Sequence, residues 1–193
     1  MTAVDDHIVT QIIELESACE RGDLAETHRL LHCISLDEPR RNAMYACLLK
    51  ASTNGHVDIV RRLLVEPDVD PTISCFMALR CAREHGHTEV AQVLMDDARF
   101  DARTFFNYEL YSACWDGNET YVNQLLDSGD AEPSAHEYLI VRWAVRNGRE
   151  ALLRRLLGDA RVDVTCARAL VRLDAHHAQW TISAPMQALL DAA

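Results

Sequence analysis

The sequence predicts an all-α protein in which five similar helical hairpins stack into a solenoid, followed by a degenerate hairpin that caps the C-terminal end. The prediction depends on glycines that recur at a nearly constant spacing, on flanking residues that repeat with them, and on apolar residues with helical periodicity. The glycines are Gly22, Gly55, Gly86, Gly117 and Gly148, which are separated by 33, 31, 31 and 31 residues.

The residues around each glycine keep a common register in all five copies. Alanine stands four residues before every glycine, and leucine or valine stands seven residues before it. An acidic residue stands fifteen residues after each glycine. The alanines are Ala18, Ala51, Ala82, Ala113 and Ala144, and the acids are Asp37, Asp70, Asp101, Glu132 and Asp163. A register kept through five copies makes a chance spacing implausible.

Each copy has the pattern of two helices joined at the glycine. Apolar residues seven, four and three positions before the glycine lie on one face of a helix, and the glycine supplies the left-handed backbone that ends this helix. A second apolar stripe follows, formed in the second copy by Ile59, Val60, Leu63 and Leu64. One hairpin cannot bury such stripes alone, so neighbouring hairpins must stack.

Acidic pairs recur in the segments that connect the hairpins. Asp68 with Asp70 and Asp130 with Glu132 are expected to bond local amides and cap the next helix. The pair at residues 96–97 is interpreted as a solvated turn.

The chain is predicted to form a single domain over residues 1–193. The repeats are expected at residues 5–38, 39–69, 70–100, 101–131 and 132–163, with the cap at 164–193. The opening helix is expected over residues 5–20, with Asp5 or Asp6 near its N-cap. In the cap, helices are expected over residues 166–178 and 185–191, with Gln179 at the glycine position.

The pattern resembles the ankyrin repeat. The strings Ala51-Ser52-Thr53-Asn54-Gly55-His56 and Ala82-Arg83-Glu84-His85-Gly86-His87 look like that family's Ala-Ala-x-x-Gly-His core, and the resemblance covers roughly residues 5–165. The Thr-Pro-Leu-His opening is absent, and the 31-residue period is about two residues short of the usual one. These features are similar to a divergent branch found in protists, algae and their large viruses. The resemblance implies reduced loops, imidazoles that cap backbone groups at the loops, and partner binding on a concave face.

Composition narrows the classes of function. The 30 acidic and 19 basic residues give a formal charge of −11, which disfavours nucleic-acid binding. No apolar run is long enough for a membrane span, and the N-terminal residues lack the pattern of a secretory signal. Seven cysteines, with no close Cys-x-x-Cys pair, argue against a disulfide framework and a zinc ribbon. A reducing cytoplasmic or nuclear location is therefore expected, and most of these thiols are expected to be packed.

No constellation of catalytic residues is apparent, and no cofactor or metal site is predicted. His28 and His32 share one helix face beside Cys33, but no further ligand stands near them in the sequence. The alternative hypothesis is a small-ligand or metal-binding protein, or an enzyme, that uses a pocket lined by histidine and cysteine.

The expected binding surface is a stripe along the first helix of each hairpin, formed by the residues ten, six and two positions before the glycine. Tyrosine, tryptophan and arginine, which carry most interface energy, are enriched there. The predicted partner-binding residues are Tyr45, Phe76, Arg80, Asn107, Tyr111, Trp115, Tyr138, Arg142 and Arg146. The aromatic members of the second, third and fifth copies could equally pack as core between hairpins.

A basic cluster, formed by Arg142, Arg146, Arg149, Arg154 and Arg155, stands in the fifth copy. It is interpreted either as a contact for an acidic peptide or phosphate, or as a solvated face that balances nearby acids.

The function predicted from these observations is a non-catalytic scaffold that binds another protein of unknown identity, with Tyr111 and Trp115 as central anchors. A further possibility is self-association through an incompletely capped end that exposes Leu189 and Leu190.

Overall fold

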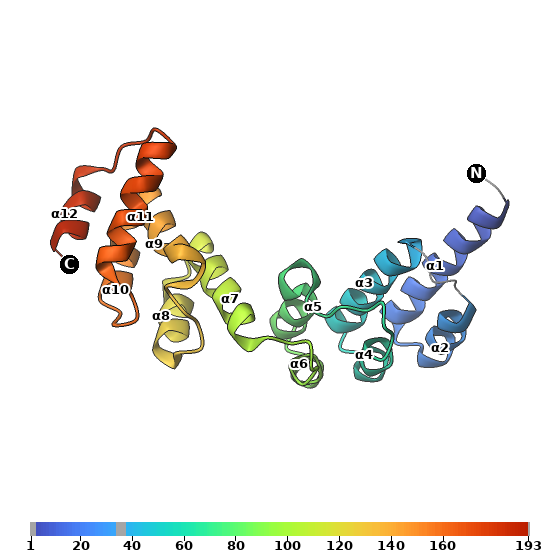
Figure 1. Ribbon diagram of the computed structural model, residues 1–193. Helices are drawn as coiled ribbons and strands as arrows, with labels where there is room; N and C mark the ends of the chain where they lie inside the picture. Colours follow the sequence, from blue (N-terminus) through green and yellow to red (C-terminus); the bar gives the residue numbers. More distant parts are fainter. Residues whose placement is uncertain (1–2, 34–37, 193) are drawn as a thin grey trace. The chain divides into compact units, whose positions relative to one another are not determined.

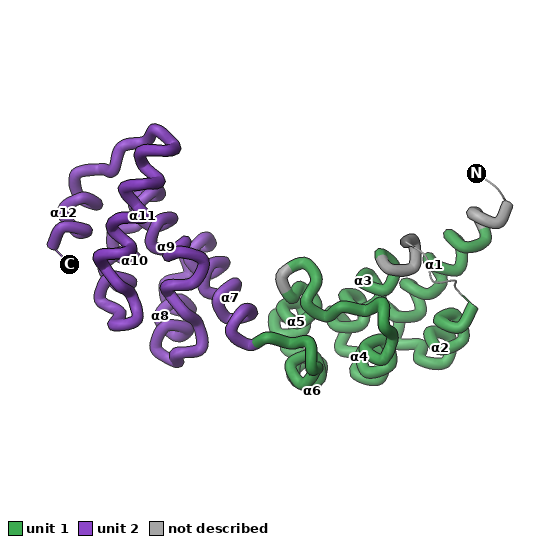
Figure 2. Tube along the Cα trace, viewed as in Figure 1, with its two compact units in different colours: residues 1–101 green, residues 102–193 purple. Residues whose placement is uncertain are grey.

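The computed structural model describes the backbone of residues 3–33 and 38–192 and the side chains of residues 7–33, 42–74 and 76–192. Within these ranges every regular element is an α-helix and no strand occurs, which confirms the all-α prediction. The chain divides into two compact units, residues 1–101 and 102–193 (Figure 2). The division lies one residue from the predicted boundary between the third and fourth repeats.

The described part of the first unit forms three helical hairpins (Figure 1). The first helices of neighbouring hairpins pack on one another, and the second helices do the same. The hairpins are α1 (Ala3–Arg21) with α2 (Leu24–Cys33), α3 (Glu38–Thr53) with α4 (Val57–Leu64), and α5 (Ile73–Glu84) with α6 (Thr88–Met95). The opening helix thus begins at residue 3, and the side chains of Asp5, Asp6 and Asp37 lie outside the described residues.

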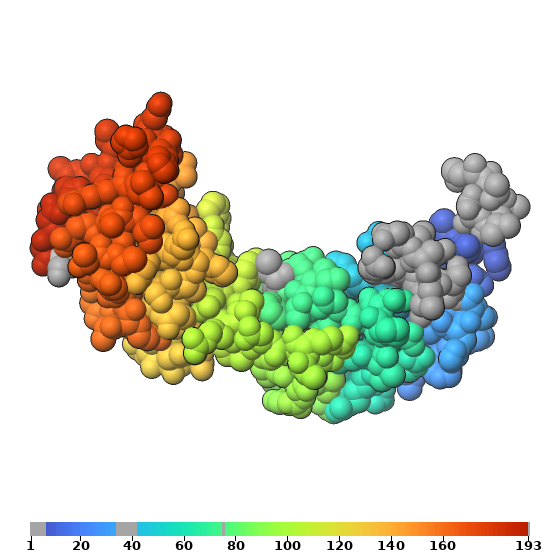
Figure 3. Space-filling model, viewed as in Figure 1, coloured from blue at the N-terminus to red at the C-terminus, as the bar shows by residue number. Residues whose placement is uncertain are grey.

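The described part of the second unit also forms three hairpins, and Figure 3 shows the atoms that cover the helices on one face of each unit. They are α7 (Ala102–Asp116) with α8 (Glu119–Ser128), α9 (Ala135–Arg146) with α10 (Glu150–Leu157), and α11 (Val164–His177) with α12 (Ala184–Ala192). Here α9 packs against α7 and α11, and α10 packs against α12. The last hairpin is the predicted cap, but it does not expose its leucine pair, because Leu190 is 0% exposed and Leu189 is half-buried.

A left-handed residue ends the first helix of every hairpin. Gly22, Gly55, Gly86, Gly117 and Gly148 have φ between 65° and 81°, and Gln179 takes their place in the cap with φ 53°. The residue after each of these donates its N–H to the carbonyl of the alanine that stands four positions before the glycine or Gln179. His56, for example, donates to the Ala51 carbonyl at 2.9 Å. This is the Schellman pattern, which satisfies a carbonyl group that the helix leaves free. The recurring alanine therefore marks both a buried position and a hydrogen-bond acceptor.

The predicted core register is confirmed along the described helices. The residues seven positions before the glycines are at most 1% exposed, and the alanines four positions before them are at most 4% exposed. In the second helices Ile59, Val60 and Leu63 are buried, as are most of their counterparts in the later hairpins, whereas Tyr121 and Leu152 are half-buried. The two apolar faces of each hairpin are therefore covered by its neighbours within the unit.

The connecting segments follow the expected turn chemistry at several positions. Asp70 accepts hydrogen bonds from the Thr72 N–H at 2.9 Å and the Thr72 hydroxyl at 2.7 Å. Asp163 is the N-cap of α11 and accepts from the N–H groups of Thr165 and Cys166. The described connections contain no strand, so they are short loops, as expected.

Two histidines connect neighbouring hairpins of the first unit. The Nε2 atom of His56 lies 2.9 Å from the Glu20 carbonyl oxygen at the end of α1, and Nε2 of His87 lies 2.9 Å from the Thr53 carbonyl oxygen at the end of α3. Each imidazole also packs over the glycine of the preceding hairpin, at Gly22 and Gly55. The expected caps thus act between hairpins, because neither side chain bonds its own helix N-terminus.

Two arginines make a second type of connection, which the sequence analysis missed. Arg161 donates to the carbonyl oxygens of Leu126 and Ala131 in the preceding hairpin, both at 2.8 Å, and pairs with Asp159 at 2.8 Å. In the first unit Arg99 donates in the same way to the Leu64 carbonyl at 3.0 Å and to that of Val69, while it pairs with Asp97.

The carboxylate beside each of these arginines is part of the connection. The side chain of Asp97 is 12% exposed and its pKa is lowered by the Arg99 guanidinium, so the interpretation of residues 96–97 as a solvated turn is wrong at Asp97. The Arg161 guanidinium lowers the pKa of Asp159 to about 2. Each arginine thus binds carbonyl groups of one hairpin while a carboxylate of its own hairpin fixes its orientation.

The histidine contact predicts different costs for two glycine substitutions in the same unit. Both Gly55→Ala and Gly86→Ala place a side chain on left-handed backbone, which costs about 1–2 kcal/mol. At Gly55 the added Cβ would also lie 2.6 Å from the His87 ring, whereas at Gly86 no atom of its own unit lies within 4 Å. We expect Gly55→Ala to lower the free energy of unfolding by about 1 kcal/mol more than Gly86→Ala. Urea unfolding followed by circular dichroism measures the difference, and equal losses would contradict the contact.

The low pKa of Asp159 predicts a pH dependence of stability. Because the folded-state pKa of about 2 lies below the ordinary 3.8, the carboxylate stabilises the fold fully above about pH 4. This stabilisation is lost as the pH falls from about 4 to 2. Asp159→Asn should cost about 1–2 kcal/mol at neutral pH and should flatten the decline of the unfolding midpoint in that range. The exposed Asp130→Asn serves as control, and an unchanged slope in Asp159→Asn would refute the assignment.

Candidate functional site

Three aromatic side chains of α7 and α9 form a cluster in the second unit, which we call the aromatic cluster: Tyr111, Trp115 and Trp143. The ring centroids of Trp115 and Trp143 lie 5.7 Å apart, and those of Tyr111 and Trp115 lie 6.2 Å apart. Trp115 is 60% exposed, whereas Tyr111 and Trp143 are half-buried. Together with Tyr108 and Ser112, the first two rings line a shallow hollow. The cluster therefore offers a large apolar surface to solvent.

The helical period of α7 places these rings. Residues 108, 111, 112 and 115 are three or four positions apart, so they lie on one side of the helix. The opposite side carries Leu110, Ala113 and Cys114, which are buried. Burial of this second face fixes the orientation of α7 and holds Trp115 outward.

The arginines of the fifth hairpin that are near the aromatic cluster in sequence differ in whether an acidic side chain pairs with them. The guanidinium carbon of Arg149 lies 6.0 Å from the Trp143 ring centroid, at the outer limit of a cation–π contact. Arg146 is exposed and has no acidic partner among the described residues. Arg142 instead pairs with Asp174 of α11 at 2.7 Å, and this contact raises its pKa.

The five arginines of the predicted basic cluster therefore fall into two groups, those that pair with acidic side chains and those that do not. Arg155 binds Asp127 at 2.7 Å and also lies 3.6 Å from Asp159, so it balances acids of the same unit, as Arg142 does. Arg146, Arg149 and Arg154 are exposed and make no ion pair within the described residues. Positive charge that is free to meet a partner thus lies beside the aromatic cluster, at Arg146 and Arg149.

The remaining predicted partner-binding residues do not join this cluster. Phe76 is 5% exposed and packs edge-on against Phe100 with ring centroids 5.7 Å apart, so it belongs to the core of the first unit. Asn107 accepts a hydrogen bond from the Glu132 N–H at 2.6 Å and holds the connection before α9. Tyr138 is half-buried against the core of the second unit. Tyr45 and Arg80 are half-buried in the first unit.

The expected stripe breaks because the backbone leaves the helical region at two of its positions. Phe76 has φ 59°, and Tyr138 has φ 57° within a left-handed segment at residues 136–138. A spacing of four places residues on one face only in a regular right-handed helix. The positions ten residues before Gly86 and Gly148 therefore do not continue the stripe, whereas Tyr111 and Trp115 lie on regular helix.

Histidine and cysteine do not converge on a shared site in the described part of the chain. No group of three histidine, cysteine or acidic side chains that could hold a metal ion occurs among the described residues. The rings of His28 and His32 contact each other edge-on at 4.7 Å, and both side chains are exposed.

The described cysteines are free thiols in contrasting environments. Cys19, Cys47 and Cys114 are buried, and burial raises the pKa of the Cys114 thiol to about 12. Cys33 and Cys166 are exposed and Cys81 is half-buried, so three of the six described thiols are packed in the core.

Comparison with protein-family models, with curated proteins and with solved structures found no match. Among the described helices, none combines the length and apolar character needed to cross a bilayer. The candidate site is therefore argued from its own geometry, in which the aromatic cluster and the adjacent arginines are the features that a partner could contact.

The environments of the thiols predict a clear order of chemical reactivity. With iodoacetamide near neutral pH, Cys33 and Cys166 should react first, because thiolates are the nucleophiles and these side chains are accessible. Cys114 should remain unmodified until the protein unfolds, since it is buried and its pKa is about 12. Mass spectrometry of peptides after timed labelling measures the order. Labelling of Cys114 as fast as Cys166 in the folded chain would show that its assigned environment is wrong.

Proposed function

We propose that this chain is an ankyrin-like repeat protein that binds another protein without catalysing a reaction. The observation that carries the proposal is the aromatic cluster, in which Trp115 is 60% exposed beside two further aromatic rings. Exposed clusters of this composition are typical of interaction sites, because burial of a tryptophan supplies much of an interface's binding energy. The proposed site corresponds to the concave face of ankyrin arrays, where that family holds its partners.

The charges around the cluster support a partner of defined chemistry. Arg149 is exposed beside Trp143, and the exposed Arg146 stands one helical turn after Trp143 on α9, although the chain as a whole carries a formal charge of −11. A partner segment that places an apolar side chain on Trp115 and a carboxylate near Arg146 would satisfy both features. The free thiols of the described cysteines support a reducing cytoplasmic or nuclear setting for this interaction.

The alternative of an enzyme or a metal-binding protein gains no specific support from the described residues. His56 and His87 are engaged with backbone carbonyls of neighbouring hairpins, and the buried Cys114 has a raised pKa. A nucleophilic cysteine requires an accessible thiolate, which this environment disfavours.

A substitution series tests the proposed site. Bait chains with the natural sequence and with the double substitution Trp115→Ala and Arg146→Ala are compared in affinity capture, and a partner retained by the first bait alone is purified. Trp115→Ala should then weaken its binding by about 2 kcal/mol, or about 30-fold in Kd. Arg142 is left intact, because its pairing with Asp174 stabilises the fold.

The control is Val65→Ala, which truncates an apolar side chain that is also exposed, at 78%, but lies in the first unit. It should leave the Kd unchanged, and circular dichroism should show that both variants are folded. Equal affinity of the natural chain and Trp115→Ala for a purified partner would reject the aromatic cluster as the binding site.

A further inference from the structure

The junctions between hairpins in the first unit contain a slot that an imidazole ring fills. The slot lies over the left-handed glycine of one hairpin, and the ring comes from the residue after the glycine of the next hairpin. A Cβ at Gly22 would lie 2.7 Å from the His56 ring, and one at Gly55 would lie 2.6 Å from the His87 ring. In both slots the ring Nε2 atom lies 2.9 Å from the carbonyl oxygen two residues before the glycine.

The same slot is open at the junction between α7–α8 and α9–α10. Here Arg149 stands at the position of the two histidines, and its guanidinium carbon lies 6.0 Å from the Trp143 ring. Nothing lies within 4 Å of the place where a Cβ of Gly117 would be. The Trp115 carbonyl, which corresponds to the carbonyls that His56 and His87 bind, accepts no hydrogen bond from the described residues.

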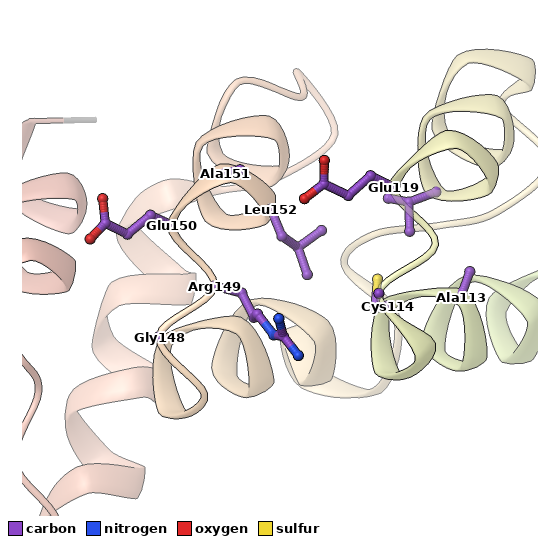
Figure 4. A pocket seen from close by; sticks show the side chains of 10 residues that line it. Ala113, Cys114, Glu119, Gly148, Arg149, Glu150, Ala151 and Leu152 are labelled. Atoms are coloured by element: carbon purple, nitrogen blue, oxygen red, sulfur yellow. The ribbon is translucent and has the colours of Figure 1, made fainter.

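A cavity of about 260 Å³ occupies this junction (Figure 4). Its lining includes Gly117, Val122, Leu152 and Arg149, and the carboxylate-bearing Glu119 stands at the end of α8 next to it. The cavity is much larger than the roughly 30 Å³ that one water molecule occupies in the liquid. It therefore has room for a small ring, with apolar walls on Val122 and Leu152. The Trp115 carbonyl precedes the lining residue Gly117 by two positions, as the carbonyls bound by His56 and His87 precede their glycines.

We propose that this cavity is a binding site for an imidazole ring supplied by another molecule, either a small imidazole compound or a histidine side chain of a partner. The ring would lie over Gly117 and donate its N–H to the Trp115 carbonyl, which repeats the arrangement that His56 and His87 make within the chain. A glycine at position 117 is required for this, since a Cβ there would occupy the space of the ring. The inference goes beyond the proposed protein-binding function and does not depend on it.

Titration with imidazole tests the site directly. At about pH 8 the ring is neutral and carries one N–H donor. The backbone amide signals of Gly117, Gly148 and Arg149 should shift and saturate in two-dimensional NMR spectra of the full chain. Arg149→His should fill the slot from within, abolish these shifts and raise the midpoint of thermal unfolding. Arg154→His is the matched control, because it introduces the same ring at an exposed arginine outside the cavity lining, and it should leave the imidazole Kd unchanged.

A second ligand tests the hydrogen bond. The compound 1-methylimidazole has the same ring but no N–H at about pH 8, and it should bind about 3- to 10-fold more weakly. A short peptide with one histidine distinguishes the source of the ring: tighter binding than imidazole assigns the slot to a partner's side chain, and exclusion of the peptide assigns it to a small compound. Unsaturable shifts, equal binding of 1-methylimidazole, or unchanged imidazole shifts in Arg149→His would each overturn the proposal.

Discussion

The structure depends on how the carbonyl groups at the ends of its helices find hydrogen-bond donors. A helix leaves its last carbonyls unpaired, and in short hairpins these groups form a large share of the backbone. The chain meets this need in two ways, the first in every hairpin and the second at particular junctions. The residue after the glycine donates its N–H to the recurring alanine, and side chains of the next hairpin bind the carbonyls that remain. Stacking of hairpins is thus a matter of polar satisfaction as well as of apolar burial.

Different side chains make these connections at different places along the chain. Histidine makes the connection at the residues that follow Gly55 and Gly86, where its ring also covers the glycine of the preceding hairpin. Arg99 and Arg161 make it from the segment after the second helix of their hairpins. The arginines each bind two carbonyls while an aspartate of their own hairpin holds them, so three groups must be in place at once. Such groups stabilise one arrangement of neighbouring hairpins more than any other, because a displaced neighbour would leave a buried charge pair with fewer partners.

Much of the fold could be predicted from the sequence, because the information is local. The glycine register predicts the turns, and the apolar period predicts which side of each helix is buried. Arg99 and Arg161 were missed because their contacts depend on the stacking distance. The sequence signal is weak: the tripeptide Asp-Ala-Arg stands at residues 97–99 and again 62 residues later at 159–161, but it also stands at residues 101–103, where it begins α7.

The binding surface was harder to predict for a related reason. The stripe assumes a regular helix, and the left-handed backbone at Phe76 and Tyr138 breaks that assumption. Tyr111 and Trp115 were predicted because α7 is regular there. Trp143, five residues before Gly148, falls outside the stripe and reaches Trp115 only through the packing of α9 on α7.

Several local features of this repeat change at the junction between the fourth and fifth hairpins, and the open space over the glycine is also found at Gly148. Arginine replaces histidine at residue 149, the carbonyl of Trp115 loses its donor from the next hairpin, and the side chain of the same tryptophan is exposed. Each departure costs stability, since an apolar ring is left in water and a tie between hairpins is missing. At the two junctions where a histidine follows the glycine, the equivalent carbonyl receives a hydrogen bond from the next hairpin. The same arrangement would be possible with histidine at residue 149. Tyr111, Trp143 and Arg149 supply some contacts inside the unit, but Trp115 stays 60% exposed and its carbonyl receives no donor from the described residues. A molecule that brings an apolar surface and an N–H group would satisfy both groups at once, which is the physical basis of the two proposals.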